Sequence, residues 1–312
     1  MRSFPPEPAG RRKKRRGWGT LMAGAFLAGL LLTGGVLLIP TRDGAPPPGP
    51  SSFAPAAARP ALADNGAAPP GNGAPSPLLA IVVDDLGHDP VRDAEWLAFP
   101  EKITASVLPY GPSSKTIAAS ARSKGFSVIL HVPMEPERPS ADGTEPYRLR
   151  RGMTPEEMDK EVARMARDVP QATGASNHMG SAFTSDPAAM DAFLAVLKGK
   201  GFFFVDSVTG AGSVGAEAAA RAGVPVLRRD VFLDDDARPE EMRRQWEKAI
   251  AVAKERGGAV LICHSRRDTL AALLGMLPEL RREGIRAVTV EEMLVAQDTP
   301  SLPPGHGPRV SR

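Results

Sequence analysis

Titratable side chains recur at the ends of short apolar runs in this sequence, and their types are those that bind metal ions and move protons. They are the pair Asp84-Asp85, Tyr110, His131, His178, Asp206 and His264, together with Asp230, which lies within a run. Histidine nitrogens and carboxylate oxygens are the usual ligands of a catalytic divalent metal such as zinc, which takes three of them and leaves a position for water. One carboxylate must stay unligated to accept that water's proton. The group therefore predicts a metal-dependent hydrolytic site.

The adjacent carboxylates Asp84 and Asp85 are expected to divide these two roles. Neighbouring residues of a strand point to opposite sides, and Gly87 allows the chain to turn just after them. Each titratable residue also has an ordinary structural explanation, since Asp84 or Asp206 could cap a helix and a single histidine is often only a core residue. Their shared position at the ends of the runs favours one common site.

The runs that carry these residues alternate with helical segments between Leu78 and Leu294. In order, they are LLAIVVDD, ITASVLP, SVILHVP, ASNHMG, FFFVDS, VPVLRRDVFL, AVLICHS and RAVTV. Nearly continuous apolar runs are typical of parallel strands buried on both faces. About seven repeats of strand and helix predict a closed or nearly closed α/β barrel, whose active site lies at the carboxyl ends of its strands. A doubly wound open sheet is the alternative.

Three helix starts can be located from their capping residues. Thr154-Pro155-Glu156-Glu157 has the pattern of a capping box with proline at the first helical position. Asp186-Pro187 and Arg238-Pro239 are expected to open two more helices.

The segments on either side of this predicted domain, residues 78–297, have different compositions. Residues 17–39 form an uncharged apolar run of about the 20 residues that span a bilayer. The basic segment 1–16 precedes it, so the positive-inside rule keeps that segment in the cytoplasm and sends the domain to the periplasmic side of the inner membrane. A cleaved signal peptide is the alternative, although its apolar region is usually shorter. Residues 40–77, rich in Pro, Ala and Gly, read as a linker and 298–312 as a disordered tail.

The charge distribution argues against nucleic-acid binding, and the single cysteine argues against thiol chemistry. Residues 1–16 hold seven basic residues and one acid, so they contribute +6 to a formal charge of +3 and leave −3 for the rest. The domain therefore has no basic excess for nucleic-acid binding. Cys263 is the only cysteine, so it cannot form an internal disulfide and is expected to lie in the core.

The segments around the strand ends resemble the divergent polysaccharide deacetylase family, which is related to metal-dependent carbohydrate esterases. The segments that carry the resemblance are IVVDDLG, ILHVPMEP, NHMGSAFTS, FFFVDSVT, VPVLRRDVFLDD and LICHSR, in that order. The resemblance implies a deformed (β/α) barrel. It also implies hydrolysis of N-acetyl groups of an amino-sugar polysaccharide through a metal-bound water, with zinc as the expected divalent metal.

The resemblance implies catalytic roles for five residues. Asp84 would be the general base and His264 the general acid, with Asp206 holding and polarising that histidine. Arg229, which lies beside Asp230 in this catalytic group, would tune the base.

The metal ligands implied by the resemblance include one open position. Asp85 and His131 match metal ligands of the family, but Glu135 stands where ordinary deacetylases have a second histidine. The third ligand is therefore either Glu135 or His178. Because the histidine pair is broken, a catalytically inactive glycan-binding or envelope-organising protein is the alternative function. A hydrolase that uses carboxylates alone is a third possibility.

Overall fold

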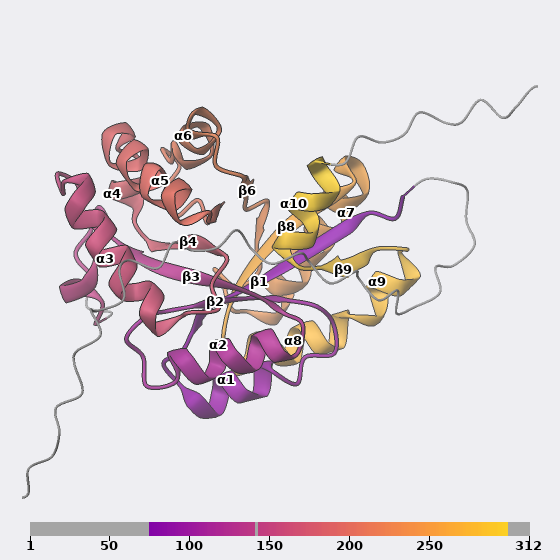
Figure 1. The fold of residues 1–312 in the computed structure, drawn as a ribbon. Helices are drawn as coiled ribbons and strands as arrows, with labels where there is room; N and C mark the ends of the chain where they lie inside the picture. The colour runs from indigo at the N-terminus through magenta and orange to yellow at the C-terminus, as the bar shows by residue number, and fades with distance from the viewer. Residues whose placement is uncertain (1–74, 141–142, 299–312) are drawn as a thin grey trace, which may run out of the picture. The chain divides into compact units, whose positions relative to one another are not determined.

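Nine parallel strands form one curled sheet in the part of the chain that the computed structural model describes, residues 75–140 and 143–298 (Figure 1). In chain order the strands are β1 (Leu78–Leu86), β2 (Thr104–Val107), β3 (Ser127–Met134), β4 (Gly174–Met179), β5 (Phe203–Asp206), β6 (Val226–Arg228), β7 (Val231–Phe232), β8 (Gly258–His264) and β9 (Arg286–Val288). The helices are α1 (Pro90–Trp96), α2 (Ser114–Ser123), α3 (Pro155–Asp168), α4 (Ser181–Thr184), α5 (Pro187–Lys200), α6 (Gly215–Ala222), α7 (Pro239–Arg256), α8 (Arg267–Met276), α9 (Pro278–Arg282) and α10 (Val290–Asp298), with a 3₁₀ turn η1 (Glu145–Tyr147).

The order of the strands is that of an incompletely closed barrel. It runs β6-β5-β4-β3-β2-β1-β8-β7, with β9 paired to the first residues of β1. This order winds in one direction, whereas a doubly wound sheet reverses at a switch point. The edge strands β6 and β7 do not pair with each other among the described residues, yet only Arg229 and Asp230 separate them in sequence. The predicted deformed barrel is therefore confirmed as a curled, parallel half-barrel.

The run VPVLRRDVFL was expected to be one strand, and this prediction is wrong. It forms two strands, β6 and β7, at opposite edges of the sheet. The backbone changes partner between them, because Arg229 N donates to the carbonyl of Asp206 and Asp230 N donates to the carbonyl of Val260. These two residues thus carry the chain across the opening of the barrel.

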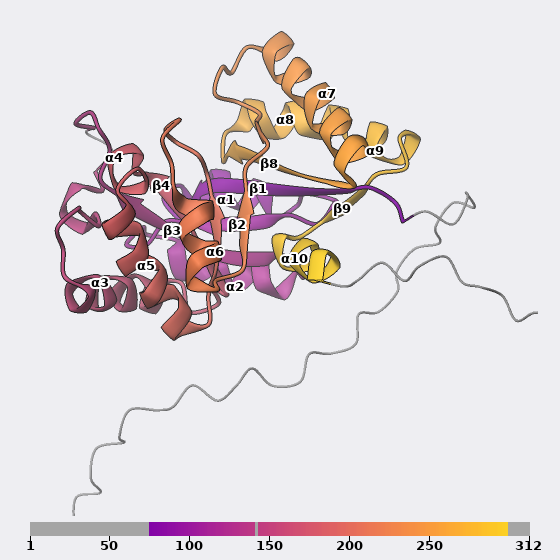
Figure 2. The ribbon, with the colours of Figure 1, turned by 90° about the horizontal axis from the view of Figure 1, so that it is seen from above.

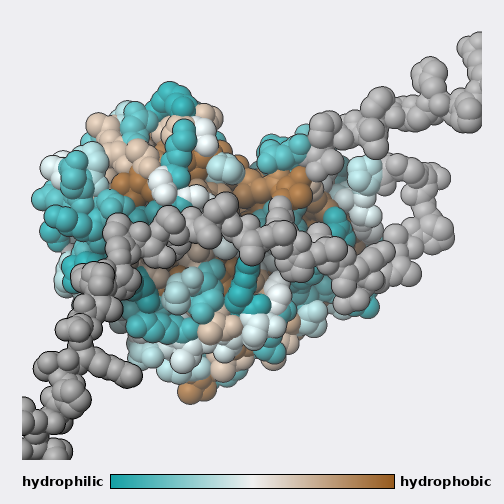
Figure 3. Space-filling model, viewed as in Figure 1, coloured by the Kyte–Doolittle hydropathy of each residue, from teal (hydrophilic) through white to brown (hydrophobic). Residues whose placement is uncertain are grey.

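The two faces of the sheet carry separate apolar clusters. On β1, Leu79, Ile81 and Val83 belong to the larger cluster, which the surrounding helices cover, whereas Ala80 and Val82 belong to a smaller cluster with residues of α10. Helix α10 lies on the side of the strands opposite α1 and α2 (Figures 1 and 2). Hydrophobic side chains reach the surface between α6 and α10 on the face seen in Figure 3. We call the face covered by α10 the inner face.

The predicted helix starts are confirmed. Thr154 accepts a hydrogen bond from Glu157 N, and the side chain of Glu157 accepts one from Thr154 N. Asp186 accepts from the first backbone N–H groups of α5, and α7 begins at Pro239. Cys263 is fully buried in β8, as expected.

The apolar run 17–39, the basic segment 1–16 and most of the predicted linker and tail lie outside the described residues. Within the described ranges, no helix has both the length and the hydropathy needed to cross a membrane. The predicted anchor is therefore untested by the structure.

The turn after β1 is held by a buried carboxylate of α1. Asp93 is fully buried, and its Oδ2 accepts hydrogen bonds from Gly87 N at 2.8 Å and from Ser113 Oγ at 3.2 Å. Its anchoring of Gly87 fixes the backbone two residues after Asp85.

Replacing Asp93 by alanine is expected to lower the free energy of unfolding by about 2–6 kcal/mol, because each of two buried donors that loses its acceptor costs about 1–3 kcal/mol. Urea denaturation measures this change. The matched control is Glu95→Ala on the same helix, which removes only an exposed ion pair with Arg267 and should cost about 1 kcal/mol or less. Equal losses in the two variants would contradict this role of Asp93.

Candidate metal and catalytic centre

Four strands place titratable side chains on the inner face, in the carboxyl-terminal half of each strand. These side chains are Asp84 on β1, His131 on β3, His178 on β4 and His264 on β8. Side chains alternate along a strand, so Asp84 shares the inner face with Val82, and His264 shares it with Ile262. The strand pairing aligns Asp84 with His264 and sets His178 beside Pro133 of β3. The curled sheet therefore collects these groups at one end of the barrel.

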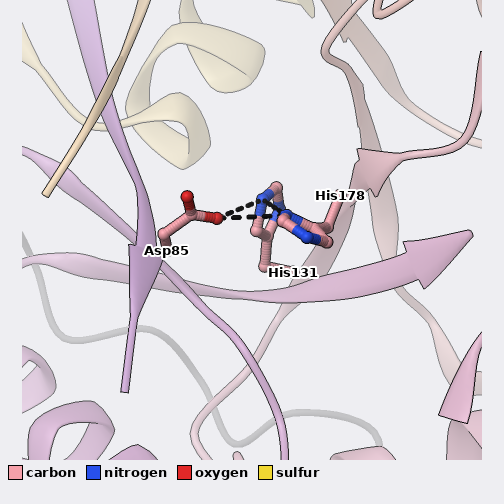
Figure 4. A group of neighbouring side chains, drawn as sticks. All are labelled: Asp85, His131 and His178. Atoms are coloured by element: carbon pink, nitrogen blue, oxygen red, sulfur yellow. Dashed lines mark hydrogen bonds and ion pairs between the residues drawn. The ribbon is translucent and has the colours of Figure 1, made fainter. Parts of the chain in front are cut away.

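Asp85, His131 and His178 turn three ligand atoms toward one another (Figure 4). Asp85 Oδ1 lies 3.1 Å from His178 Nδ1 and 3.4 Å from His131 Nε2, and the two histidine nitrogens are 3.3 Å apart. Zinc binds N and O ligands at roughly 2.0–2.2 Å in a tetrahedron, which sets neighbouring ligand atoms roughly 3.3 Å apart. The triangle therefore fits a divalent cation of this size.

The burial and the lowered pKa of Asp85 also suit a bound cation. Its Oδ1 is buried and has no hydrogen-bond partner among the described residues. Burial alone would raise the pKa of Asp85, but the imidazoles of His131 and His178 hold it well below its ordinary value. A buried, ionised oxygen without a hydrogen bond is a group that a bound cation would satisfy.

Asp85 reaches this group because its backbone leaves the strand conformation. Strand alternation alone would point it away from the inner face, but its φ of 65° is left-handed, and the pairing of β1 with β2 shifts register between Val83 and Leu86. Met179, next to His178, and Val208, just after β5, also have positive φ. Such non-glycine residues cost on the order of 1–3 kcal/mol each and tend to cluster at functional sites. Here Asp85 and Met179 lie in the last residues of β1 and β4, and Val208 lies just after β5.

Asp84 lies beside the triangle without belonging to it. Its Oδ1 is 3.7 Å from His131 Nδ1, on the other side of the imidazole from the ligand nitrogen. The carboxylate is almost fully buried, and this burial raises the pKa of Asp84, although His131 and a hydrogen bond from Ser106 oppose the shift. Asp84 is thus an unligated carboxylate of increased basicity.

His264 approaches the triangle from β8, the strand on the other side of β1 from β2 and β3. Its second imidazole nitrogen is held by a carboxylate. Its Nε2 is 4.0 Å from Asp85 Oδ2, and its Nδ1 is 3.0 Å from Oδ1 of the fully buried Asp234. Asp234 also accepts from Thr269 Oγ1 at 2.7 Å. Burial would lower the pKa of His264, but the Asp234 carboxylate raises it above its ordinary value. His264 therefore tends to keep its proton.

A family model for divergent polysaccharide deacetylases matches residues 81–294, which include every titratable residue described above. The match covers more than half of the chain. The chain belongs to the divergent polysaccharide deacetylase family.

The chain is also similar to individual bacterial proteins and to a solved structure. A Haemophilus influenzae protein is 37% identical over 204 residues, which are 64% of this chain and 72% of that protein. YibQ of Escherichia coli K12 is 35% identical over 202 residues, 65% of this chain and 63% of YibQ, so the match spans slightly less than two thirds of that protein. The crystal structure of an uncharacterised Agrobacterium tumefaciens C58 protein is similar in fold, with a TM-score of 0.64, 24% identity, and coverage of 72% of this chain and 92% of that one.

Of the two candidates for the third ligand in this deacetylase-family chain, the structure brings His178 to the triangle. Glu135 instead accepts hydrogen bonds from the backbone N and the guanidinium of Arg151, both at 2.9 Å. These bonds hold Glu135 in the loop after β3, and they lower its pKa. The side chain that lies beside His131 and Asp85 is thus His178 of the next strand, and not Glu135.

The prediction that Asp206 holds His264 is wrong. Asp206 shares the outer face of β5 with Phe204, and its oxygens accept hydrogen bonds from Val208 N and Ser213 Oγ, both at 2.9 Å. The partner of His264 is Asp234, which the sequence prediction missed. Asp234 directly follows the run that ends in Phe232-Leu233, so the strand-end signal was present in the sequence.

Arg229 and Asp230, which the resemblance placed in the catalytic group, have structural partners. Asp230 accepts hydrogen bonds from Val260 N and Arg256 Nη1. Val260 precedes His264 by four residues, or roughly 13 Å of strand, so Asp230 lies away from the site.

Arg229 lies nearer to the site and holds the backbone that follows β5. It donates to the carbonyls of Ser207 at 2.6 Å and Val208 at 2.8 Å. Its guanidinium also lies 4.9 Å from the ring centre of Phe232, whose ring is 5.0 Å from that of His264. Burial lowers the pKa of Arg229, while Asp235, Asp206 and Asp84 oppose that shift.

Replacing Asp234 by asparagine is expected to lower the pKa of His264, because the carboxylate that raises it is removed while the burial that lowers it remains. An NMR titration of the imidazole in the metal-free protein measures the change. Asp235→Asn at the exposed neighbouring position is the control and should leave this pKa nearly unchanged. A His264 pKa that stays the same in the Asp234 variant would contradict the assigned pairing.

Proposed function

We propose that this chain is a metal-dependent hydrolase that removes N-acetyl groups from an amino-sugar polysaccharide of the cell envelope. The observation that carries the proposal is the triangle of Asp85, His131 and His178, set beside a carboxylate and an imidazole that do not belong to it. Family membership supports the reaction class.

We propose zinc as the metal, held by the three atoms of the triangle. When bound, a divalent cation of this kind supplies a Lewis acid for the amide carbonyl and increases the acidity of water. Two nitrogen ligands and one carboxylate are a common set for catalytic zinc.

The remaining proton transfers are assigned to this chain's own side chains. Hydrolysis of an N-acetyl group adds a water oxygen to the carbonyl carbon, and the amine nitrogen must gain a proton as the C–N bond breaks. Asp84 is suited to accept the water's proton, because burial raises its pKa. His264 is suited to donate a proton to the amine, since Asp234 favours its protonated form and its Nε2 faces the triangle.

We also propose that the domain acts outside the cytoplasm, at the outer side of the inner membrane. The support is the apolar run 17–39 preceded by a basic segment. Protease protection in spheroplasts tests this location: a tag after residue 298 should be digested without lysis of the cells. Digestion only after lysis would contradict it.

The test of the function is acetate release by the purified protein. Loaded with zinc, cobalt or nickel, it should bind about one ion per chain and release acetate from chitooligosaccharides or peptidoglycan fragments. Glycan binding without metal and without acetate release would select the non-catalytic alternative. Hydrolysis that resists chelators would select carboxylate-only chemistry.

A further inference from the structure

The imidazole of His131 has a second nitrogen that faces away from the triangle and into the barrel. Its Nδ1 lies 2.7 Å from Ser176 Oγ, and Ser176 Oγ lies 2.9 Å from Ser106 Oγ. The Ser106 hydroxyl also lies close enough to the carboxyl group of Asp84 to lower the pKa of that group. Side chains from β2, β3 and β4 thus form a continuous series of hydrogen bonds, and its Ser106 end lies near Asp84 on β1.

These hydrogen-bonded side chains are buried inside the protein. Ser106 and Ser176 are fully buried, and His131 and Asp84 are 2% and 4% exposed. Both serines alternate with outer-face residues, Ala105 on β2 and Ala175 on β4, so they point to the inner face. The direct path from His131 Nδ1 to Asp84 Oδ1 is 3.7 Å, which is too long for a hydrogen bond. The two hydroxyls therefore give the route of short contacts that leads from His131 toward Asp84.

The number of available hydrogens allows only two donor-to-acceptor orders along this series of hydrogen bonds. A neutral imidazole carries one hydrogen, and each serine hydroxyl donates one. If Nε2 is to bind a cation, the ring hydrogen must be on Nδ1, so Nδ1 donates to Ser176, Ser176 donates to Ser106, and Ser106 donates to Asp84. In the opposite direction the ring hydrogen lies on Nε2, inside the triangle, where it blocks the ligand lone pair.

We propose that Ser106 and Ser176 are positioning residues that hold His131 in its Nδ1–H tautomer, so that Nε2 offers its lone pair to a cation and the same orientation directs the Ser106 hydroxyl to Asp84. This inference rests on the proposed metal site. It adds a physical link between one metal ligand and the proposed base, through groups that touch neither metal nor substrate. Partners on the second nitrogen of a metal-binding histidine commonly fix its tautomer in this way.

The test uses the full-length protein with selectively ¹⁵N-labelled histidine, which gives only five imidazoles to assign. Long-range ¹H–¹⁵N spectra of the metal-free protein report the tautomer of His131, and competition with a chelator gives the zinc affinity. Ser176→Ala is expected to lose the Nδ1–H tautomer and to bind zinc roughly 10- to 100-fold more weakly. Ser176→Thr, which keeps the hydroxyl, should restore both properties.

Two further variants separate this role from simple packing. Ser127 is a buried serine on β3 whose hydroxyl has no partner among the described residues, so Ser127→Ala is the matched control and should behave as wild type. Ser106→Ala tests the far end of the chain if Ser176→Ala does not fold, and should change the tautomer in the same direction. An unchanged tautomer and zinc affinity in the folded serine variants would overturn the inference. If the wild type binds no zinc, the proposed function fails, but the tautomer comparison still decides the role of the serines.

Discussion

Replacing Asp85 by alanine is expected to abolish tight zinc binding and, with it, the release of acetate. Asp85 contributes the only carboxylate oxygen of the triangle, and that oxygen is buried without a hydrogen bond. Loss of an outer-shell partner already costs 10- to 100-fold in metal affinity, so loss of this ligand should cost at least about 100-fold. Titration calorimetry with zinc and elemental analysis of the purified protein measure the effect.

The matched control is Glu135→Ala, which removes the carboxylate that was the other candidate for the third ligand. Because Glu135 is paired with Arg151, this variant should bind zinc as the wild type does. The pair of variants decides between the two candidate ligand sets. Zinc binding that survives Asp85→Ala but fails in Glu135→Ala would refute the triangle.

The strand pattern and the location of the site could be predicted from sequence because both depend on local features. Continuous apolar runs indicate parallel strands, and parallel strands place their carboxyl ends at one edge of the sheet. Asp84, His131, His178 and His264 meet there for this reason. The division of one run into β6 and β7 was not predictable in this way, since it depends on which distant strand each half pairs with.

The partner of His264 shows that a position at a strand end does not by itself say which face of the sheet a side chain lies on. Asp206 and Asp234 both lie at strand ends, and only the face of the strand distinguishes them. Asp206 has the same parity as the outer-face Phe204, whereas Asp234 is two residues after Phe232, which contacts the inner cluster. The alternation of side chains between the two faces of a strand, applied to each run, would have selected Asp234 as the partner of His264.

The geometry of Asp85 could not be derived from parity at all. Its left-handed φ reverses the direction that alternation would give its side chain. The resemblance to the family placed Asp85 among the proposed ligands, and the structure brings its carboxylate to the triangle although strand alternation would not. The unusual conformation itself becomes evident only in the three-dimensional structure.

Replacing Asp84 by asparagine is expected to lower kcat for acetate release by roughly 10²- to 10⁴-fold, the usual contribution of a general base. Zinc affinity should change little, because Asp84 is not one of the three atoms of the triangle. The asparagine carbonyl can still accept a hydrogen bond from the Ser106 hydroxyl in its proposed orientation, so the tautomer of His131 should also be kept. Steady-state kinetics on a chitooligosaccharide, with zinc affinity measured in parallel, test this expectation.

The matched control for Asp84 is Asp206→Asn, a carboxylate at another strand end that faces outward. It should keep kcat near the wild-type value, since Asp206 contacts neither the triangle nor His264. If Asp84→Asn lost zinc as well as turnover, Asp84 would be a ligand, and the base would have to be sought elsewhere. If it kept both, the proton acceptor would be another group. Only the loss of kcat with zinc retained places Asp84 at the chemical step, because an interaction made only in the transition state lowers kcat without weakening binding of the ground state.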